Sequence, residues 1–327
     1  MLFTAVYFLI ALGFSFSLTP LVRKFAQQHH MVATENHRTL HRGRVPKFGG
    51  AAIAIAFAAG IAAISFLQND YFMQNIAAIT SLLFCSLVIF TLGSFDDRFD
   101  LNCNLKLLVE LLAAFVVVYF GWRMEALVLP NLIRIELGWL SYPVSIFWIV
   151  GLANAINLID GLDGLAGGVV VMTAIINIAV ALIFQNVLAI TLAVILIGAV
   201  LGFLRYNLNP ARIFMGDSGS LMLGFLTACI SLNAASVTPG SVILAVPVLL
   251  LALPITDTVL AIIRRLRRGI HPFHADREHI HHRLVNLGLS QAGAAMCMVG
   301  LSCLLGILAF LVAKSVYTDI RLLSLLP

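Results

Sequence analysis

Long apolar runs alternate with short polar segments along the whole chain. A helix needs about 20 apolar residues, within a range of about 17–25, to cross the hydrocarbon core of a bilayer. The pattern predicts an all-α, polytopic integral membrane protein with about ten transmembrane helices, built as a single domain over residues 1–327. The least distinct boundary lies between two spans that only Gln185 and Asn186 separate. The predicted spans are 2–22, 49–67, 75–95, 104–121, 142–159, 165–184, 186–204, 218–235, 241–263 and 291–313.

Basic residues orient these spans. Loops rich in Lys and Arg stay on the cytoplasmic side of a membrane. With the N-terminus outside, all but four of the 20 Lys and Arg, and all nine His, lie in or beside four cytoplasmic loops. In the longest outer loop, residues around 133–137 alternate between apolar and polar, which predicts a short hairpin. The predicted cytoplasmic loops are 23–48, 96–103, 205–217 and 264–290.

The composition agrees with a membrane protein. The 327 residues are 61% hydrophobic and 11% charged, whereas a soluble domain carries about 25% charged residues. The net charge of +5 follows from the basic loops, and no aromatic and basic surface suited to nucleic acid is present. The five cysteines form no CxxC pair, so we expect plain packing and no disulfide framework.

Acidic motifs lie at the ends of three of the apolar spans, all on the predicted cytoplasmic side. The first is Asp96-Asp97, whose adjacent carboxylates repel each other and need a metal, a cation or a shared proton. Alone, this pair is best read as a solvated helix end with a local ion pair to Arg98 or Lys106. Because two more acidic motifs fall on the same face, we favour a functional site.

Asn154, Asn157, Asp160 and Asp163 recur at every third position. Each step turns about 60° away from the previous one on a straight helix, so the four side chains cannot all face one way. The glycines from Gly161 onward predict that the helix ends near Asp160 and that a turn carries Asp163 into the next span. Helix capping explains one Asp and one Gly, but not two Asp-Gly pairs preceded by two Asn. The segment therefore suits the binding of a nucleotide.

Residues 214–220, Phe-Met-Gly-Asp-Ser-Gly-Ser, open the eighth span. The free N–H groups at a helix N-terminus suit phosphate. Asp217 suits a hard cation such as Mg²⁺, which prefers oxygen ligands and often bridges substrate phosphates. The alternative is an ordinary N-terminal cap.

The last and first cytoplasmic loops carry the remaining candidates. In the last loop, His279, His281 and His282 follow a run of arginines. Zinc binding is disfavoured because neither a cysteine nor an HExxH pattern accompanies them, so contact with phosphate oxygens is favoured. In the first loop, Lys47 is placed to meet an anion, with topological anchoring equally plausible. Asp257 has either a role at the edge of the site or an internal hydrogen bond.

Together these motifs resemble those of the polyprenyl-phosphate N-acetylhexosamine-1-phosphate transferase family, or glycosyltransferase family 4. The resemblance rests on Asp96-Asp97, Asn-Leu-Ile-Asp-Gly-Leu-Asp-Gly at 157–164, Met-Gly-Asp-Ser-Gly at 215–219 and the histidine motif at 275–284, in the order typical of the family. The order His-Ile-His-His at 279–282 is similar to that of the bacterial undecaprenyl-phosphate GlcNAc-1-phosphate transferases. Some members of that branch carry an eleventh span, whereas this chain ends soon after the tenth.

The resemblance implies transfer of GlcNAc-1-phosphate from UDP-GlcNAc to undecaprenyl phosphate, with release of UMP. It also implies Mg²⁺, replaceable by Mn²⁺, a site that faces the cytoplasm in the bacterial inner membrane, and the first membrane step of a surface polysaccharide such as O-antigen. It leaves room for a homodimer and for another UDP-N-acetylhexosamine. The implied site residues are catalytic Asp96, Asp97, Asp217, His279, His281 and His282, substrate-binding Lys47, Asn154, Asn157, Asp160, Asp163 and Arg283, and metal-binding Asp217 and Asp160.

Two other classes of protein compete with this interpretation. A polytopic transporter would carry ionisable residues near the middle of the membrane and on both faces, whereas this chain keeps them mostly at one face. A lipid-binding scaffold does not need so many grouped carboxylates.

Overall fold

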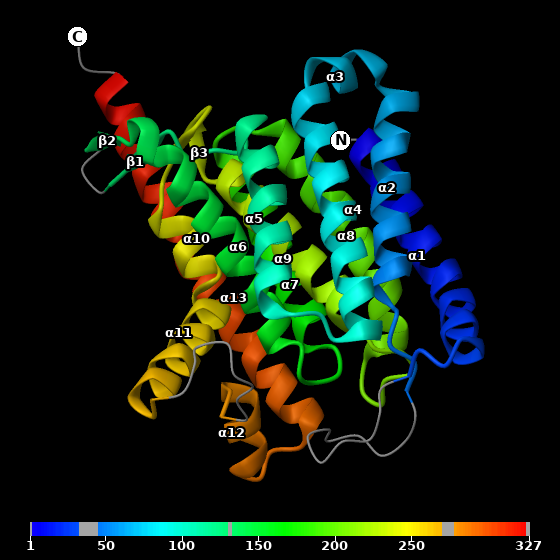
Figure 1. Cartoon of the computed structure of the whole chain (residues 1–327). Coiled ribbons are helices and arrows are strands. Elements are labelled where there is room, and N and C mark those ends of the chain that lie inside the picture. The colour runs from blue at the N-terminus through cyan, green and yellow to red at the C-terminus, as the bar shows by residue number, and fades with distance from the viewer. Residues whose placement is uncertain (1, 33–44, 130–132, 270–277, 325–327) are drawn as a thin grey trace.

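The computed structural model describes residues 2–32, 45–129, 133–269 and 278–324. Long helices run side by side through the molecule and form one bundle (Figure 1). Within the described residues, seven helices are long and apolar enough to cross a membrane. The protein is therefore a multi-pass membrane protein. These seven candidate spans are Phe3–Gln28, Gly50–Leu67, Ile76–Phe99, Gly138–Ile159, Leu165–Ile183, Val187–Asn207 and Gln291–Arg321.

The helices follow the predicted apolar runs, although several continue further than predicted. Helix α4 ends at Phe99 and places Asp96 and Asp97 in its last turn, not in a loop. Much of the predicted basic loops, over 33–44 and 270–277, lies outside the described residues. The helices are α1 (Leu2–Gln28), α2 (Gly50–Leu67), α3 (Asn69–Gln74), α4 (Ile76–Phe99), α5 (Cys103–Tyr119), η2 (Gly138–Leu140), α6 (Ser141–Ile159), α7 (Leu165–Ile183), α8 (Val187–Asn207), α9 (Gly216–Ala234), α10 (Ala245–Leu250), α11 (Ala252–Arg267), α12 (Ile280–Asn286) and α13 (Gln291–Ser324).

The predicted ninth span, 241–263, is not one continuous helix. Its start lies in a strand, and the helical part is broken at Leu251 between α10 and α11. Pro254, in the first turn of α11, has no N–H to donate to the carbonyl of Leu250, and its ring would clash with that carbonyl in a continuous helix. In Figure 1, α11 leaves the bundle and extends outward at the lower left.

Helix α9 forms the centre of the bundle. It packs against α4, α6 and α7, and nearly all of its residues are buried. Small residues allow this close approach: a Cβ on Gly224 would lie 2.7 Å from Cα of Ala153 on α6. Close backbone contact through small residues is a common way to pack helices in membranes.

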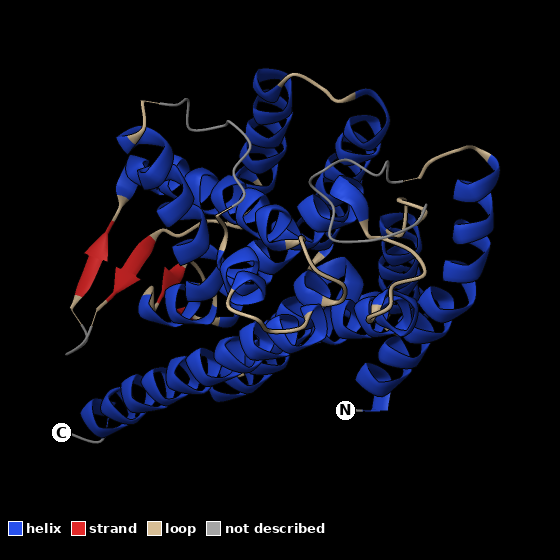
Figure 2. Ribbon diagram, turned by 90° about the horizontal axis from the view of Figure 1, so that it is seen from below, coloured by secondary structure: helices blue, strands red, loops and turns tan. Residues whose placement is uncertain are grey.

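A small sheet at the upper end of the bundle is an exception to the all-α prediction. The predicted hairpin is present as β1 (Ala126–Val128) paired antiparallel with β2 (Arg134–Glu136). Two further strands, β3 (Ser236–Thr238) and β4 (Ser241–Val242), complete the order β2-β1-β4-β3, with β1 parallel to β4. Figure 2 shows these strands at one side of the helices.

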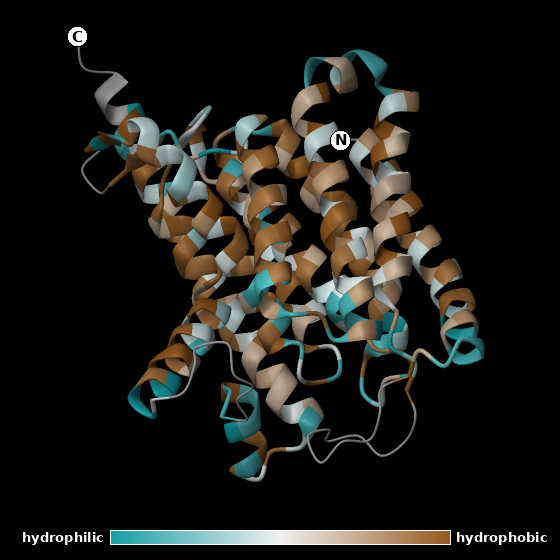
Figure 3. Cartoon of the chain, in the orientation of Figure 1, coloured by the Kyte–Doolittle hydropathy of each residue, from teal (hydrophilic) through white to brown (hydrophobic). Residues whose placement is uncertain are grey.

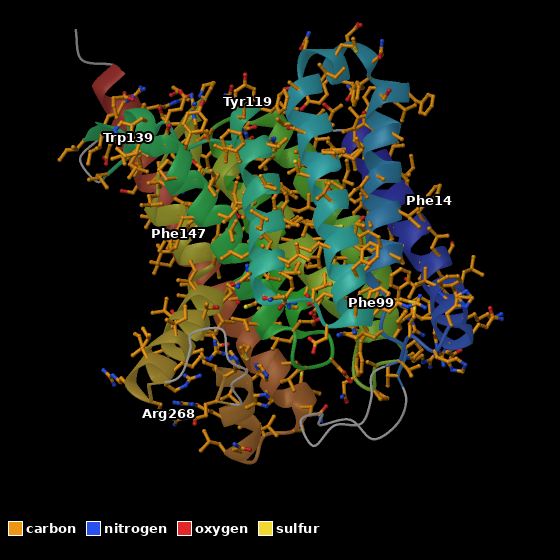
Figure 4. The ribbon with its side chains drawn as sticks, viewed as in Figure 1. Phe14, Phe99, Tyr119, Trp139, Phe147 and Arg268 are labelled. Atoms are coloured by element: carbon orange, nitrogen blue, oxygen red, sulfur yellow. The ribbon has the colours of Figure 1, made fainter. Side chains whose placement is uncertain are left out.

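The two ends of the bundle differ. Helix α1 begins and α13 ends in the upper part of Figure 1, while α4 ends, α5 begins and α12 lies in the lower part. In Figure 4, Trp139 and Tyr119 mark the upper end, Phe99 and Arg268 mark the lower end, and Phe147 points outward at mid-height. Figure 3 shows mainly hydrophobic residues along the middle of the helices and polar residues gathered at both ends.

Candidate active site

The segments that precede α2 and α9 pair with each other at the lower end of the bundle. Lys47 and Phe214 form a parallel bridge. Phe214 N donates to the carbonyl of Pro46 at 2.8 Å, and Gly49 N donates to the carbonyl of Phe214 at 2.8 Å. A Cβ on Gly50 would lie 2.4 Å from Gly219 N, so only glycine fits where the two helices begin. This pairing brings the first cytoplasmic loop of the prediction beside the Met-Gly-Asp-Ser-Gly motif.

Asp97 joins three elements. Its Oδ1 lies 2.7 Å from Lys47 Nζ. The same carboxylate accepts hydrogen bonds from Asp217 N at 2.9 Å and from Ser218 N at 3.1 Å. The side chain of Asp97 is only 1% exposed. Asp97 is thus an internal anchor that fixes Lys47 and the start of α9.

This arrangement differs from the prediction that the N-terminus of this helix receives a phosphate. The carboxylate of Asp97 already occupies the backbone N–H groups of Asp217 and Ser218. It also complements the positive end of the helix dipole. Any phosphate bound at this end of α9 would therefore have to be met mainly by side chains.

Lys47 and Asp217 remain accessible. Their side chains are 33% and 34% exposed, and Lys47 Nζ lies 3.9 Å from Asp217 Oδ1. Burial opposes the charge on Lys47, but the carboxylates of Asp217 and Asp97 outweigh it and raise the pKa of the ammonium group above its ordinary value. Lys47 is therefore a permanent cation beside a reachable carboxylate.

Asp96 turns away from Lys47 toward α5. Its carboxylate accepts from Lys106 Nζ at 2.8 Å and from Leu101 N at 2.8 Å. It also interacts with the side chain of Asp217 through a hydrogen bond. Two carboxyl groups in contact need a shared proton or a cation between them.

The four polar residues around the end of α6 have different bonding partners. Asn157 donates to Ser220 Oγ at 2.8 Å and ties α6 to α9. Asp160 ends α6 close enough to Lys47 and Asp217 for their charges to interact. Burial, and after it the negative charge of Asp217, raises the pKa of Asp160 to about 7.

Asp163 and Asn154 make their hydrogen bonds to other elements of the protein. Asp163 is buried and accepts from Asn209 Nδ2 at 3.0 Å and from Ala211 N at 2.9 Å, so it holds the loop between α8 and α9. Asn154 donates to the carboxylate of Glu110 on α5. Glu110 was not among the predicted site residues, because it is a lone acid within an apolar run whose only signal is Lys106 four positions earlier.

Asp257 anchors the histidine motif by an internal hydrogen bond. It is fully buried in α11, where its Oδ2 lies 2.8 Å from His279 Nδ1 and its Oδ1 accepts from Ile280 N at 2.8 Å. The carboxylate thereby fixes both the ring of His279 and the start of α12. Of the two roles considered for Asp257, the structure contains the internal one.

His281 connects α12 to the turn that follows α6. A Cβ on Gly161 would lie 2.2 Å from His281 Nε2, so the ring packs directly on the backbone beside Asp160. Burial, and after it the charges of His282 and His279, lowers the pKa of His281 to about 4. This histidine is therefore neutral near pH 7.

His282 and Arg283 lie beside this contact. The rings of His281 and His282 have centroids 4.2 Å apart. Arg283 Nη2 lies 3.5 Å from Glu278 Oε2, so its guanidinium group is held at the surface by a carboxylate.

The predicted motifs thus converge at one end of the bundle. Lys47 contacts Asp97 and Asp217, and Asp96 interacts with Asp217. His281 packs on the turn at Asp160, whose charge interacts with those of Lys47 and Asp217. Over the parts of the chain that the structure describes, no group of three or more His, Cys, Asp or Glu is arranged to hold a metal ion.

Known proteins are similar to most of this chain, and a family model matches its central part. A model of the family described as Glycosyl transferase family 4 matches residues 79–235, which contain Asp96, Asp97, Asp160, Asp163 and Asp217. A Bacillus subtilis protein named "Probable undecaprenyl-phosphate N-acetylglucosaminyl 1-phosphate transferase" is 40% identical over 288 residues, 87% of this chain and 78% of the relative.

Two further relatives have similar names. A Mycolicibacterium smegmatis "Decaprenyl-phosphate N-acetylglucosaminephosphotransferase" is 32% identical over 334 residues, 92% of this chain and 79% of the relative. An Escherichia coli K12 "Undecaprenyl-phosphate alpha-N-acetylglucosaminyl 1-phosphate transferase" is 30% identical over 285 residues, 83% of this chain and 74% of the relative.

Proposed function

Since the chain belongs to glycosyl transferase family 4, we propose that it transfers GlcNAc-1-phosphate from UDP-GlcNAc to undecaprenyl phosphate. The products are undecaprenyl-diphospho-GlcNAc and UMP. The relatives support the chemistry, since their names give a polyprenyl phosphate and N-acetylglucosamine phosphate transfer. The observation that carries the proposal for this chain is Lys47, an accessible cation held between Asp97 and Asp217, where the segment before α2, the end of α4 and the start of α9 meet.

The reaction exchanges one phosphorus–oxygen bond for another. An oxygen of the lipid phosphate attacks the β-phosphorus of UDP-GlcNAc, which carries the sugar. The bond from this phosphorus to the bridging oxygen breaks, and the oxygen leaves with the electron pair as part of UMP. The lipid phosphate is already largely ionised near neutral pH, so Asp96 contributes little as a base. Positioning and charge stabilisation carry most of such a transfer.

The side chains of the site supply this positioning and charge. Lys47 offsets the repulsion between the two anionic substrates. Because Asp97 holds Lys47 and is itself buried, we assign Asp97 to the orientation of Lys47 and α9. His279, His282 and Arg283, at the start of α12 and within it, would contact the diphosphate or sugar, and His281 would make the neutral contact to the Asp160 turn.

The residues of the site fit Mg²⁺. Asp217 is accessible, it interacts with Asp96, and Asp160 lies nearby, so a divalent cation would relieve the repulsion among these carboxylates. Mg²⁺ is usually held by one or two carboxylates together with substrate phosphates and water, so a cluster of three protein ligands is not required. Asp217 and Asp160 would hold the ion, and Mn²⁺ would substitute. When bound, the ion would neutralise charge that develops on the diphosphate.

We further propose ten membrane crossings, with the N-terminus outside and the site facing the cytoplasm of a bacterial inner membrane. In addition to the seven candidate spans, α5, α9 and the broken pair α10–α11 would cross. The central position of α9 supports this, because a helix surrounded by other helices need not be strongly apolar. The concentration of Lys and Arg in the segments at the lower end supports the orientation.

An assay of purified protein tests the proposed reaction. Labelled UDP-GlcNAc, undecaprenyl phosphate and Mg²⁺ should give labelled lipid and an equal amount of UMP, and EDTA should stop both. UDP-GalNAc in place of UDP-GlcNAc separates the two sugars, and mass spectrometry identifies the sugar on the lipid. Absence of lipid product with every UDP-N-acetylhexosamine would overturn the proposal.

A further inference from the structure

Glu110 is a buried carboxylate that the proposed reaction does not use. It lies in α5 and is 3% exposed. Enclosing a carboxylate among helices costs free energy unless a donor meets it. The donor here is Nδ2 of Asn154, so the pair joins α5 to α6.

The nitrogen of Asn154 has both of its N–H groups committed. Nδ2 donates to Glu110 Oε2 and, at 3.0 Å, to the backbone carbonyl of Val150. A side-chain amide has two donors on its nitrogen and acceptor lone pairs on its oxygen. A backbone carbonyl can only accept, so the bond to Val150 requires the nitrogen on that side, and the carboxylate of Glu110 accepts from the same nitrogen. Together the two contacts fix the orientation of the amide.

The oxygen of the Asn154 amide is left for another partner. Among the residues that the structure describes, it accepts no hydrogen bond. Asn154 is only half-buried, and it stands about one helical turn from Asn157 and two from Asp160 on α6. The free acceptor is thus on the helix that carries the polar residues of the site.

Lys106 is not the donor that meets the buried carboxylate of Glu110. Lys106 lies one turn away on α5, where the two charges interact, but its ammonium group is already bound to Asp96 at 2.8 Å. The contact that Glu110 makes directly is the one with Asn154.

We propose that Glu110 is a positioning residue that holds the Asn154 amide so that it presents its carbonyl oxygen to the nucleotide-sugar substrate. A carbonyl oxygen accepts hydrogen bonds and cannot donate them, so Asn154 selects a substrate hydroxyl or amide N–H. The inference rests on the proposed function and deepens it, because it gives a specificity role to a residue outside the four motifs.

A double-mutant cycle tests this role. E110M removes the acceptor and keeps an apolar side chain of similar length inside the bundle, while E110Q retains an acceptor oxygen. E110M should raise the KM for UDP-GlcNAc about tenfold with kcat changed by less than about twofold, the pattern expected when uniform binding is lost. E110Q should restore the KM to near the wild-type value. In an N154A background, E110M should change the KM by less than about twofold, because it acts through Asn154.

A second pair of variants covers the case in which E110M fails to fold. N154D places two carboxylates in contact and should raise the KM. Adding E110Q to N154D again pairs one amide with one carboxylate, and should reverse most of the increase in KM. Equal effects of E110M in the wild-type and N154A backgrounds, or no recovery by E110Q in N154D, would overturn the inference alone. Lack of lipid product from the wild-type protein would overturn the proposed function and this inference with it.

Discussion

At the scale of single residues, the carboxylates of the site differ in how much of their bonding capacity the protein uses. Asp97 is buried and accepts two backbone hydrogen bonds in addition to its ion pair with Lys47. Asp217 is accessible, and its nearest cation is 3.9 Å away. Loss of the Asp97 charge should therefore disturb the fold of the site, whereas loss of the Asp217 charge should disturb chemistry.

D217N tests this division. It should lower turnover by about 10²–10³-fold, the cost typical of removing a main electrostatic contact from an active site. Thermal unfolding in detergent should change little, because Asp97 and not the side chain of Asp217 binds the start of α9. D100N is the matched control, since Asp100 is exposed just beyond the same end of α4. Near-normal turnover of D217N would remove Asp217 from the metal role.

His281 predicts a pH dependence of stability. Its pKa is lowered to about 4 by burial and neighbouring histidines, whereas an exposed histidine has a pKa of about 6.5. The unfolded chain therefore takes up the proton first, and the stability is fully present above about pH 6.5 and is lost as the pH falls toward 4.

When the pH is lowered from 7.5 to 5.5, protonation of His281 in the unfolded chain should reduce the free energy of unfolding by about 1 kcal/mol. The measurement is thermal unfolding in detergent at both pH values, for wild type and H281Q. The difference between the two pH values should be smaller in H281Q, and an equal difference would show that His281 does not titrate as expected.

Which residues pair with which could be predicted only in part. The sequence predicts that Asp97, Asp160 and Asp217 share one end of the bundle, because loop charge and span length report the path of the chain. It does not predict that Asp97 binds the backbone of α9 or that Asp257 binds His279, because those contacts depend on how helices rotate against each other. Glu110 was overlooked because its partner Asn154 lies 44 positions away on another helix.

At the scale of elements, the position of α9 has consequences that hydropathy does not report. A central helix contacts other helices instead of lipid, so Gly, Ser and Thr are tolerated along it. The break at Leu251 is similarly hidden, because the apolar run continues across it and only Pro254 indicates the interruption. The outer hairpin was predictable because alternation of residue type reports a strand directly.

The contact between α12 and the turn after α6 predicts the effect of G161A. The new Cβ would lie 2.2 Å from His281 Nε2, so the ring and α12 must shift away from Asp160. Overpacking of this kind costs about 1–3 kcal/mol, and we expect turnover to fall at least about tenfold. G151A, on α6 ahead of this turn, is the control because its Cβ would meet nothing within 4 Å.

Turnover and thermal unfolding should be compared for both glycine variants. G161A/H281A should regain part of the activity lost in G161A if the collision with the ring is the cause. If G161A and G151A behave alike, α12 does not dock on this turn.

At the scale of the whole molecule, the two ends of the bundle should face different compartments. Trp139 marks one end and Arg268 the other (Figure 4), and both side chains are exposed. In a variant whose five cysteines are replaced, W139C should react with a membrane-impermeant maleimide on intact cells. R268C should react only after the inner membrane is opened. The reverse pattern would overturn the proposed orientation.

The anchoring of α9 by Asp97 bears on inhibition by simple salts. The place that a lone inorganic anion would seek, the backbone amides at the start of a helix, is filled by a carboxylate that belongs to the protein. Free phosphate and sulfate would have to compete with this carboxylate for the amides of Asp217 and Ser218. If the protein acts as proposed, both salts should therefore inhibit it only weakly, whereas a ligand with several anionic oxygens could still be met by exposed cations such as Lys47.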